Sequence, residues 1–181
     1  MPTLYTIGHS NRSYADFLKI LQQEHITHII DLRVVPLSRF APWSNAKTLR
    51  TELAKAGILY THMPELGGRR TPVKDSINEG LRKASFRGFA DFMQTPAFFS
   101  ALQTLNRLVK KSDTIAIMCA EALPKNCHRS LIADAEILRG VNVLHITDHA
   151  PVYEHELTAC AVADQSKRPT QLYYPKKSKR P

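Results

Sequence analysis

Residues 119–129 contain two thiols, a carboxylate, an imidazole and a guanidinium. Cys119 directly follows the apolar run 114–118, which has the length and composition of a buried strand, and residues 131–138 have the apolar spacing of a helix. In an open parallel sheet, such a turn lies at the carboxyl edge of the strands, where ligands bind. The helix dipole there favours a thiolate, so Cys119 is a candidate nucleophile. The structural alternative is a small buried side chain at the end of a core strand.

Three further side chains are candidates for proton transfer in this site. Glu121 is expected near the apolar sheet edge, where burial favours the protonated carboxyl that a general acid requires. His9 follows a predicted strand, although a single histidine is also compatible with a hydrogen-bonded structural role. Asp31 precedes Arg33 by two residues, so the two side chains share one side of a strand. For this pair, an ion pair is the structural alternative.

Basic side chains follow several of the predicted strands and would bind an anion if they met in one pocket. Arg129 and the free amides at the start of the following helix would suit a phosphate or a sulfate. Arginines scattered singly over the surface would instead carry no function. The other residues expected to bind the substrate are Arg12, Arg33, Arg39, Arg69, Arg70, Arg87, Cys127 and His128.

The spacing in this turn argues against two familiar kinds of site. Thiol phosphatases and sulfurtransferases open their anion-binding loop with a cysteine, but here Cys119 and Arg129 lie ten positions apart with Pro124 between them. Zinc binding by Cys119, Cys127 and His128, with His145 as a fourth ligand, lacks a paired Cys-x-x-Cys signature. We therefore expect no metal. We also expect no cofactor, because no Gly-x-Gly-x-x-Gly fingerprint follows a strand.

Strand-like and helix-like segments alternate along the chain, which predicts an α/β fold. We expect a Rossmann-like three-layer sandwich with a mainly parallel sheet of about five strands, at residues 4–7, 28–32, 58–61, 114–118 and 141–146. Helices are expected after the cap residue Ser13, from about residue 45 to Gly57, around residues 89–93, after Thr95, and from about residue 126 to 139. A weak helix is expected near Leu157.

Residues 64–88 interrupt this periodicity. A long irregular segment inside a compact domain is uncommon and is often functional. It carries Arg69, Arg70 and Arg87, so we expect it to act as a lid that brings these arginines to the substrate when it closes.

Length and charge predict one domain, at residues 1–165, followed by a basic and flexible tail at residues 166–181. The 181-residue chain has a formal net charge of +9, and six positive charges without an acid lie in the tail, which leaves +3 for the rest. Tyr173 and Tyr174 in this tail could stack on bases of a nucleic acid. Three cysteines, no apolar run of membrane-spanning length and no signal-peptide pattern predict a cytoplasmic protein without a membrane partner.

Five motifs in series resemble one family of bacterial and archaeal proteins. They are residues 6–12, residues 31–33 with Pro36, Ser38 and Arg39, residues 65–70, residues 86–93, and residues 118–121 with 127–130. In this order, over residues 4–146, the chain is similar to the domain-of-unknown-function family numbered 488. The resemblance implies an α/β fold and a polar site built from these motifs, and it brings no reaction. The segment after residue 149 lies outside it.

The function expected from these residues is that of a small hydrolase or group transferase acting on an anionic substrate, such as a nucleotide, a nucleic acid or a phosphorylated metabolite. Cys119 would be the nucleophile, and Glu121 or His9 would handle protons. The alternative is a non-catalytic module that binds or senses a nucleotide or a nucleic acid. A metal-dependent hydrolase is the third possibility.

Overall fold

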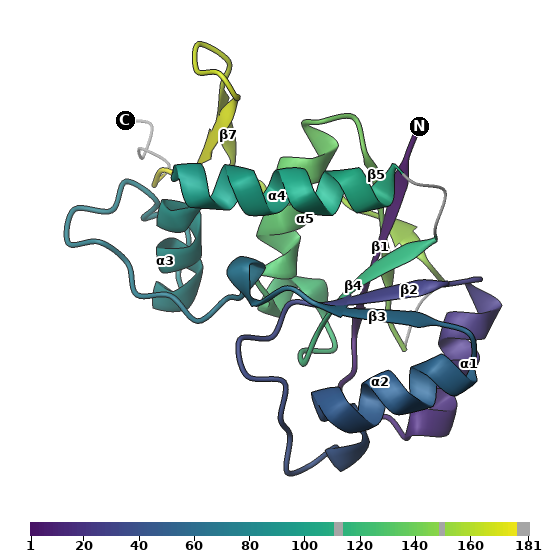
Figure 1. The fold of residues 1–181 in the computed structure, drawn as a ribbon. Helices are drawn as coiled ribbons and strands as arrows, with labels where there is room; N and C mark the ends of the chain where they lie inside the picture. The colour runs from purple at the N-terminus through teal and green to yellow at the C-terminus, as the bar shows by residue number, and fades with distance from the viewer. Residues whose placement is uncertain (111–113, 149–150, 177–181) are drawn as a thin grey trace.

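A six-stranded sheet forms the centre of the protein in a computed structural model, which describes residues 1–110, 114–148 and 151–176 (Figure 1). The spatial order is β3-β2-β4-β1-β5-β6, and every pairing is parallel except that of β5 with the edge strand β6. The bounds are β1 Thr3–Gly8, β2 His28–Asp31, β3 Leu59–His62, β4 Ile115–Cys119, β5 Asn142–Ile146 and β6 Tyr153–Glu154. The predicted α/β sandwich and its five main strands are confirmed.

The helices also lie close to the predicted positions: α1 Tyr14–Gln23, α2 Ala46–Lys55, α3 Ala84–Phe92, α4 Pro96–Val109 and α5 Arg129–Ile137. Ser13 caps α1 by accepting the amide of Asp16, and Thr95 caps α4 by accepting the amide of Phe98. Helix α5 begins later than expected. The reason is a short 3-10 turn, Pro124–Asn126, because a proline suits the first residue of a helical turn and the chain then extends at Cys127 before α5 starts.

Helices cover both faces of the sheet, which gives the three layers (Figure 1). On one face, α1 and α2 bury Phe17, Leu21, Leu49 and Leu53 against the sheet. On the other face, α3, α4 and α5 bury a larger apolar cluster that includes Tyr174. Because apolar surface is buried on both of its faces, the sheet is a rigid support for the residues at the ends of its strands.

Side chains of β4 alternate between these two faces. Ala116 and Met118 join the cluster under α1 and α2, whereas Ile115, Ile117 and Cys119 join the cluster under α3, α4 and α5. This is the two-residue period of a strand. It places Cys119 on the same face as the segment that leads into α5.

The neighbouring strands β1 and β4 send their following helices to opposite faces, since α1 and α5 belong to different layers. A crevice opens at the carboxyl ends of strands where connections diverge in this way. Gly8 at the end of β1 pairs with Cys119 at the end of β4. The topology therefore puts the predicted site residues at the switch point of the sheet.

The segment after β5 differs from its prediction. Residues 155–158 form no helix; they follow the edge strand β6 as irregular chain, and the amide of His155 donates to the carbonyl oxygen of Val143. The hairpin of β7 Val162–Asp164 and β8 Gln171–Tyr173 follows, and Leu172 and Tyr174 are buried in the core. Up to residue 174 the chain is thus part of the folded domain rather than a solvated tail. Tyr174, which is 0% exposed, is not available to stack on a base.

Within the described part of the chain, no helix has both the length and the apolar composition needed to cross a membrane.

Candidate functional site

A cavity of about 370 Å³ lies at the carboxyl edge of the sheet. The segments that follow β1, β2 and β3 line it, together with the end of β4, the start of α3 and the turn before α5. The predicted site residues among its lining are His9, Arg33, Arg69, Cys119, Glu121, Cys127 and His128. Ser38, Gly68, Ser85, Phe86 and Asn126 also line it. Motifs far apart in the sequence therefore meet in one site.

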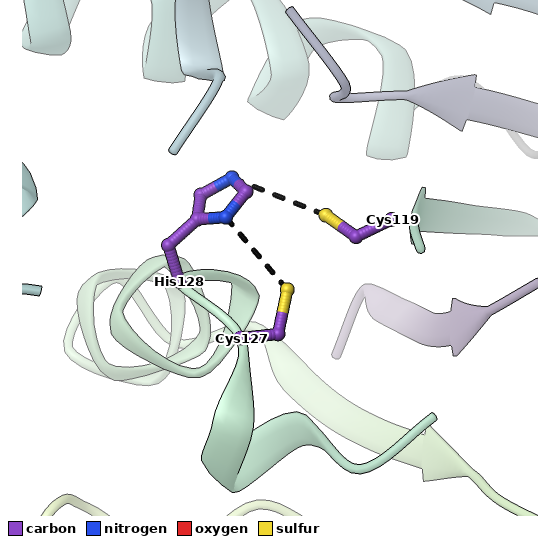
Figure 2. Close-up of side chains that lie close together, drawn as sticks. All are labelled: Cys119, Cys127 and His128. Atoms are coloured by element: carbon purple, nitrogen blue, oxygen red, sulfur yellow. Dashed lines mark hydrogen bonds between the residues drawn. The ribbon is translucent and has the colours of Figure 1, made fainter. Parts of the chain in front are cut away.

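Cys127 and His128 form the chemical centre of this cavity (Figure 2). The Sγ atom of Cys127 lies 3.7 Å from Nδ1 of His128, and Nε2 of the same ring lies 2.9 Å from the carbonyl oxygen of Leu66. A carbonyl can only accept, so Nε2 carries the hydrogen and Nδ1 presents its lone pair to the thiol. A thiol, a base and a group that orients the base are the parts of an activated nucleophile.

Cys119 completes the cluster from the opposite side, with its Sγ atom 3.9 Å from Nε2 of His128 (Figure 2). A hydrogen bond from Cys119 to Cys127 raises the pKa of Cys119 well above its ordinary value, and burial raises it further. The same hydrogen bond, together with His128, lowers the pKa of Cys127 well below its ordinary value against the opposing effect of burial. These opposite directions favour Cys127 as the more acidic thiol of the pair, rather than Cys119, the nucleophile expected from the sequence.

The imidazole of His128 packs between Gly68 and Phe89. A Cβ atom on Gly68 would lie 2.2 Å from Nδ1 of His128, so only glycine permits this close approach. On the other side of the ring, Phe89 lies with its centroid 4.8 Å from that of His128. Leu66 and Gly68 in the segment after β3, together with Phe89 of α3, therefore hold the ring of His128 in place.

Asp31 and Arg33 form the ion pair that was their structural alternative. Nη2 of Arg33 lies 2.6 Å from Oδ2 of Asp31, and Nε lies 2.9 Å from Oδ1. Tyr60 donates to the same carboxylate at 2.8 Å, and Ser44 accepts from the guanidinium. Asp31 is 0% exposed and lies outside the lining of the cavity. Of the two residues in this ion pair, Arg33 lines the cavity and Asp31 holds it from behind.

His9 lines the cavity with a ring nitrogen that has no hydrogen-bond partner among the described residues. Its Nδ1 atom donates to the carbonyl oxygen of Ser10 at 2.9 Å, which leaves the lone pair on Nε2. Burial lowers the pKa of His9, and the charge of Arg33 lowers it further. His9 is therefore a neutral acceptor at neutral pH, suited to a proton on a bound ligand.

Glu121 and Arg129 are linked through the backbone of the turn. Nη1 of Arg129 donates to the carbonyl oxygen of Glu121 at 2.6 Å, and Nη2 donates to that of Ala122 at 2.8 Å. Arg129 is 0% exposed, so it fixes the turn and acts on Cys127 through its charge rather than binding a ligand directly. Glu121 is exposed at the cavity, so the burial expected for it is not found.

The remaining arginines are distributed differently from the expected anion-binding set. Arg12 pairs with Asp148 and donates to the carbonyl oxygen of Gly8. Arg70 covers the ring of Phe92, with its guanidinium carbon 3.3 Å from the ring centroid, and Arg87 donates to two backbone carbonyl groups. Arg39 is exposed and does not line the cavity, although the neighbouring Ser38 does. Only Arg69 combines exposure with a place in the cavity wall among these five.

The segment predicted as a lid is tied to α3. Asp91 accepts hydrogen bonds from the amide of Val73 and from the side chains of Ser76 and Asn78. Arg70 and Arg87 are bonded within the segment itself. These contacts describe a structured wall of the cavity, with Arg69 at its edge.

A soft divalent cation is the ligand that the thiols and the imidazole could hold. Atoms of Cys119, Cys127 and His128 lie within 4.8 Å of one another, and zinc uses such donor sets. The two sulfur atoms, however, approach different ring nitrogens, and one of these is bonded to Leu66. A single ion would require a shift of these side chains. His145, the expected fourth ligand, is hydrogen-bonded to Thr6 and His155 instead.

A second and larger cavity, of about 940 Å³, lies beside a series of hydrogen-bonded side chains that the sequence did not predict. Asp134 accepts from Nε2 of His155 at 2.8 Å, His155 accepts from His145 at 2.9 Å, and His145 accepts from Thr6 at 2.7 Å. Burial lowers the pKa of His145 to about 3, so this ring is neutral. Of the polar residues that follow β5, Asp148 pairs with Arg12, and His149 lies outside the described residues.

Fold and site together define a three-layer α/β protein with a thiol–imidazole pair at the switch point of its sheet. The chain belongs to the family described as Domain of unknown function DUF488, whose model matches residues 13–136. No curated protein and no solved structure matches the chain.

Proposed function

We propose that this protein is a small thiol-dependent hydrolase or group transferase that acts on an anionic substrate. The observation that carries the proposal is the contact of Cys127 with Nδ1 of His128, whose other nitrogen is fixed by Leu66. In the reaction, His128 takes the thiol proton, the thiolate of Cys127 attacks the electrophilic atom of the substrate, and the bond to the leaving group breaks. The leaving group takes the proton from His128, and water or an acceptor then removes the bound group from Cys127. His9 supplies a second acceptor in the same cavity.

The anionic character of the substrate is supported by Arg69, which is exposed in the wall of the cavity. The alternative, a module that only binds a nucleotide or a nucleic acid, needs several arginines free for phosphates. Arg33, Arg70, Arg87 and Arg129 are engaged within the chain, which favours the enzyme over this alternative.

Alkylation of the thiols by iodoacetamide as a function of pH tests the nucleophile. We expect Cys127 to be labelled well below the pH at which an ordinary thiol reacts, and Cys119 to be labelled slowly. Cys127→Ser should abolish the fast reaction, whereas Cys119→Ser should retain it. A fast reaction that survives Cys127→Ser, or a midpoint near that of a free cysteine, would contradict the proposal.

The ratio of labelling rates with charged iodoacetate and neutral iodoacetamide tests the anion preference. Arg69→Ala should lower this ratio by about twofold at low salt, the size of one unscreened charge at roughly 8 Å. Arg107→Ala is the matched control, because Arg107 is also exposed but lies on α4, which contributes no residue to the lining of the cavity. An equal change in both variants would remove Arg69 from the substrate site.

A further inference from the structure

Two thiols lie in the wall of one cavity and close to each other. The Sγ atoms of Cys119 and Cys127 are within 4.8 Å, and each also contacts a nitrogen of His128. A single nucleophile needs no second thiol at this distance. Cys119 is at the end of a core strand and Cys127 precedes α5, so the fold brings the two together from separate elements (Figure 2).

We infer that Cys119 is a resolving cysteine, and that the protein carries out thiol–disulfide exchange on a small disulfide substrate through a reversible Cys119–Cys127 disulfide. The inference rests on the proposed role of Cys127 as the nucleophile and names the substrate class for that site. It also gives Cys119 a part in the reaction that the proposed function leaves open.

The first step joins Cys127 to the substrate. The thiolate of Cys127 attacks one sulfur of a disulfide R–S–S–R′, the substrate's S–S bond breaks, and R′–S⁻ leaves and takes up the proton held by His128. The product is the mixed disulfide of Cys127 with R–S. The free thiol R′–SH departs.

The second step uses the neighbouring thiol. Sγ of Cys119 attacks Sγ of Cys127, the bond to the substrate sulfur breaks, and the proton of Cys119 ends on the departing R–SH. In sum, the protein dithiol becomes a disulfide, and one R–S–S–R′ becomes R–SH and R′–SH. Closure shortens the distance between the sulfur atoms from within 4.8 Å to about 2.05 Å, and rotation of both cysteine side chains brings them together.

The surroundings of the pair suit this exchange. The turn between the two cysteines is short, and hydrogen bonds from Arg129 to the carbonyl groups of Glu121 and Ala122 fix it. This turn therefore keeps the two thiols close to each other. The cavity of about 370 Å³ has room for a small molecule rather than a protein chain. Arg69 at its wall favours a disulfide that carries carboxylates.

Reaction with dithionitrobenzoate, an aromatic disulfide bearing carboxylates, tests the inference on the full chain. Cys160, which lines the other cavity, is first replaced by Ser to leave only the two site thiols. In this background we expect two equivalents of thionitrobenzoate to be released quickly, with no adduct left and a mass lower by two hydrogen atoms. Adding Cys119→Ser should give one equivalent and a stable adduct on Cys127.

The outcomes separate this inference from the proposed function. One equivalent and a lasting adduct in the protein with both thiols would overturn the resolving role but leave Cys127 as the nucleophile. Fast release that survives Cys127→Ser would overturn both. Peptide mapping after treatment with oxidised glutathione gives a second measurement that needs no site variant: a Cys119–Cys127 disulfide is expected, and a persistent glutathione adduct on Cys127 would contradict it.

Discussion

At the scale of single residues, the proposed function depends on which of two neighbouring thiols carries the negative charge. Cys127 faces the lone pair of His128, and the thiol of Cys119 donates a hydrogen bond to the sulfur of Cys127. The pKa values of the two thiols therefore move in opposite directions. Arg129 adds a buried positive charge beneath the turn. The thiolate is therefore a property of the pair and its partners rather than of either cysteine.

Replacement of the base tests this directly. His128→Gln keeps a donor for the carbonyl oxygen of Leu66 but removes the imidazole that lowers the pKa of Cys127. The pKa of Cys127 should rise, and alkylation at pH 7 should slow by about tenfold for each unit by which the new pKa exceeds 7. Rates of iodoacetamide labelling across pH give the measurement. His25→Gln, at an exposed histidine after α1, should leave the rates unchanged.

At the scale of elements, the site exists because three segments meet at the ends of β1 and β4. The divergence of α1 and α5 opens the crevice, and the turn before α5 supplies Cys127 and His128. The segment after β3 contacts the ring of His128 through Leu66 and Gly68. The close approach of this last segment requires Gly68. Positioning of the base is thus shared between elements that are distant in sequence.

Gly68→Ala tests that shared positioning. The added Cβ would lie 2.2 Å from Nδ1 of His128, so the ring must turn away from Cys127. We expect the fast labelling of Cys127 to be lost while the protein stays folded. Gly57→Ala is the control, because Gly57 has a φ of +73° and open space around it. That variant should cost about 1 kcal/mol of stability with unchanged labelling. Equal labelling in the two variants would contradict the positioning role.

At the scale of the whole molecule, the chain after β5 belongs to the core. Tyr174 is fully buried and donates to Asp134 at 2.9 Å, which links the C-terminal hairpin to α5. The same aspartate accepts from His155 and from the amide of Thr158. Stability of the helix that follows the site thus depends on residues near the C-terminus.

Tyr174→Ala should therefore destabilise the protein by about 3–5 kcal/mol, as a buried aromatic deletion does, with a further loss from Asp134. Tyr173→Ala is the matched control, since Tyr173 is half-buried and its hydroxyl bonds only to Gln171. It should cost less than about 1 kcal/mol. Urea unfolding gives both values, and similar losses would show that residue 174 does not anchor the hairpin.

Glu136 makes the stability of the whole protein depend on pH. Burial raises the pKa of its carboxyl to about 7 from an ordinary value of 4.5, against the charge of Arg139 and a hydrogen bond from Asn106. The folded state thus binds the proton more tightly, so the contribution of this group to stability is present at low pH and is lost as pH rises from about 4.5 to 7.

Glu136→Gln should remove this dependence. At pH 8 we expect the variant to be more stable than the wild type by roughly 2 kcal/mol, from about 1.4 kcal/mol per pKa unit less the cost of burying the amide. At pH 5 the difference should nearly vanish. Chemical unfolding at both pH values gives the measurement, and an equal difference at pH 5 and pH 8 would contradict a raised pKa.

Much of the fold could be predicted, because strands and helices leave local periodic signals. The five parallel strands, the caps at Ser13 and Thr95 and the placing of residues after β1, β2 and β4 at one sheet edge follow from such patterns. The hairpin of β7 and β8 was missed because its charged sequence, interrupted by Pro169, has the composition of a solvated tail. Its burial is decided by a partner, Asp134, far away in the chain.

The sequence by itself determined the family and the α/β sandwich and indicated the stretch 119–129 as part of a candidate site, since these depend on residue types and spacing. Only the tertiary structure decided which group does what. Cys127 rather than Cys119 faces the base, Arg33 pairs with Asp31, and Arg129 supports the turn from beneath. The reason is that charge and reactivity depend on distances of a few ångströms between side chains, and these distances are set by packing across the whole chain.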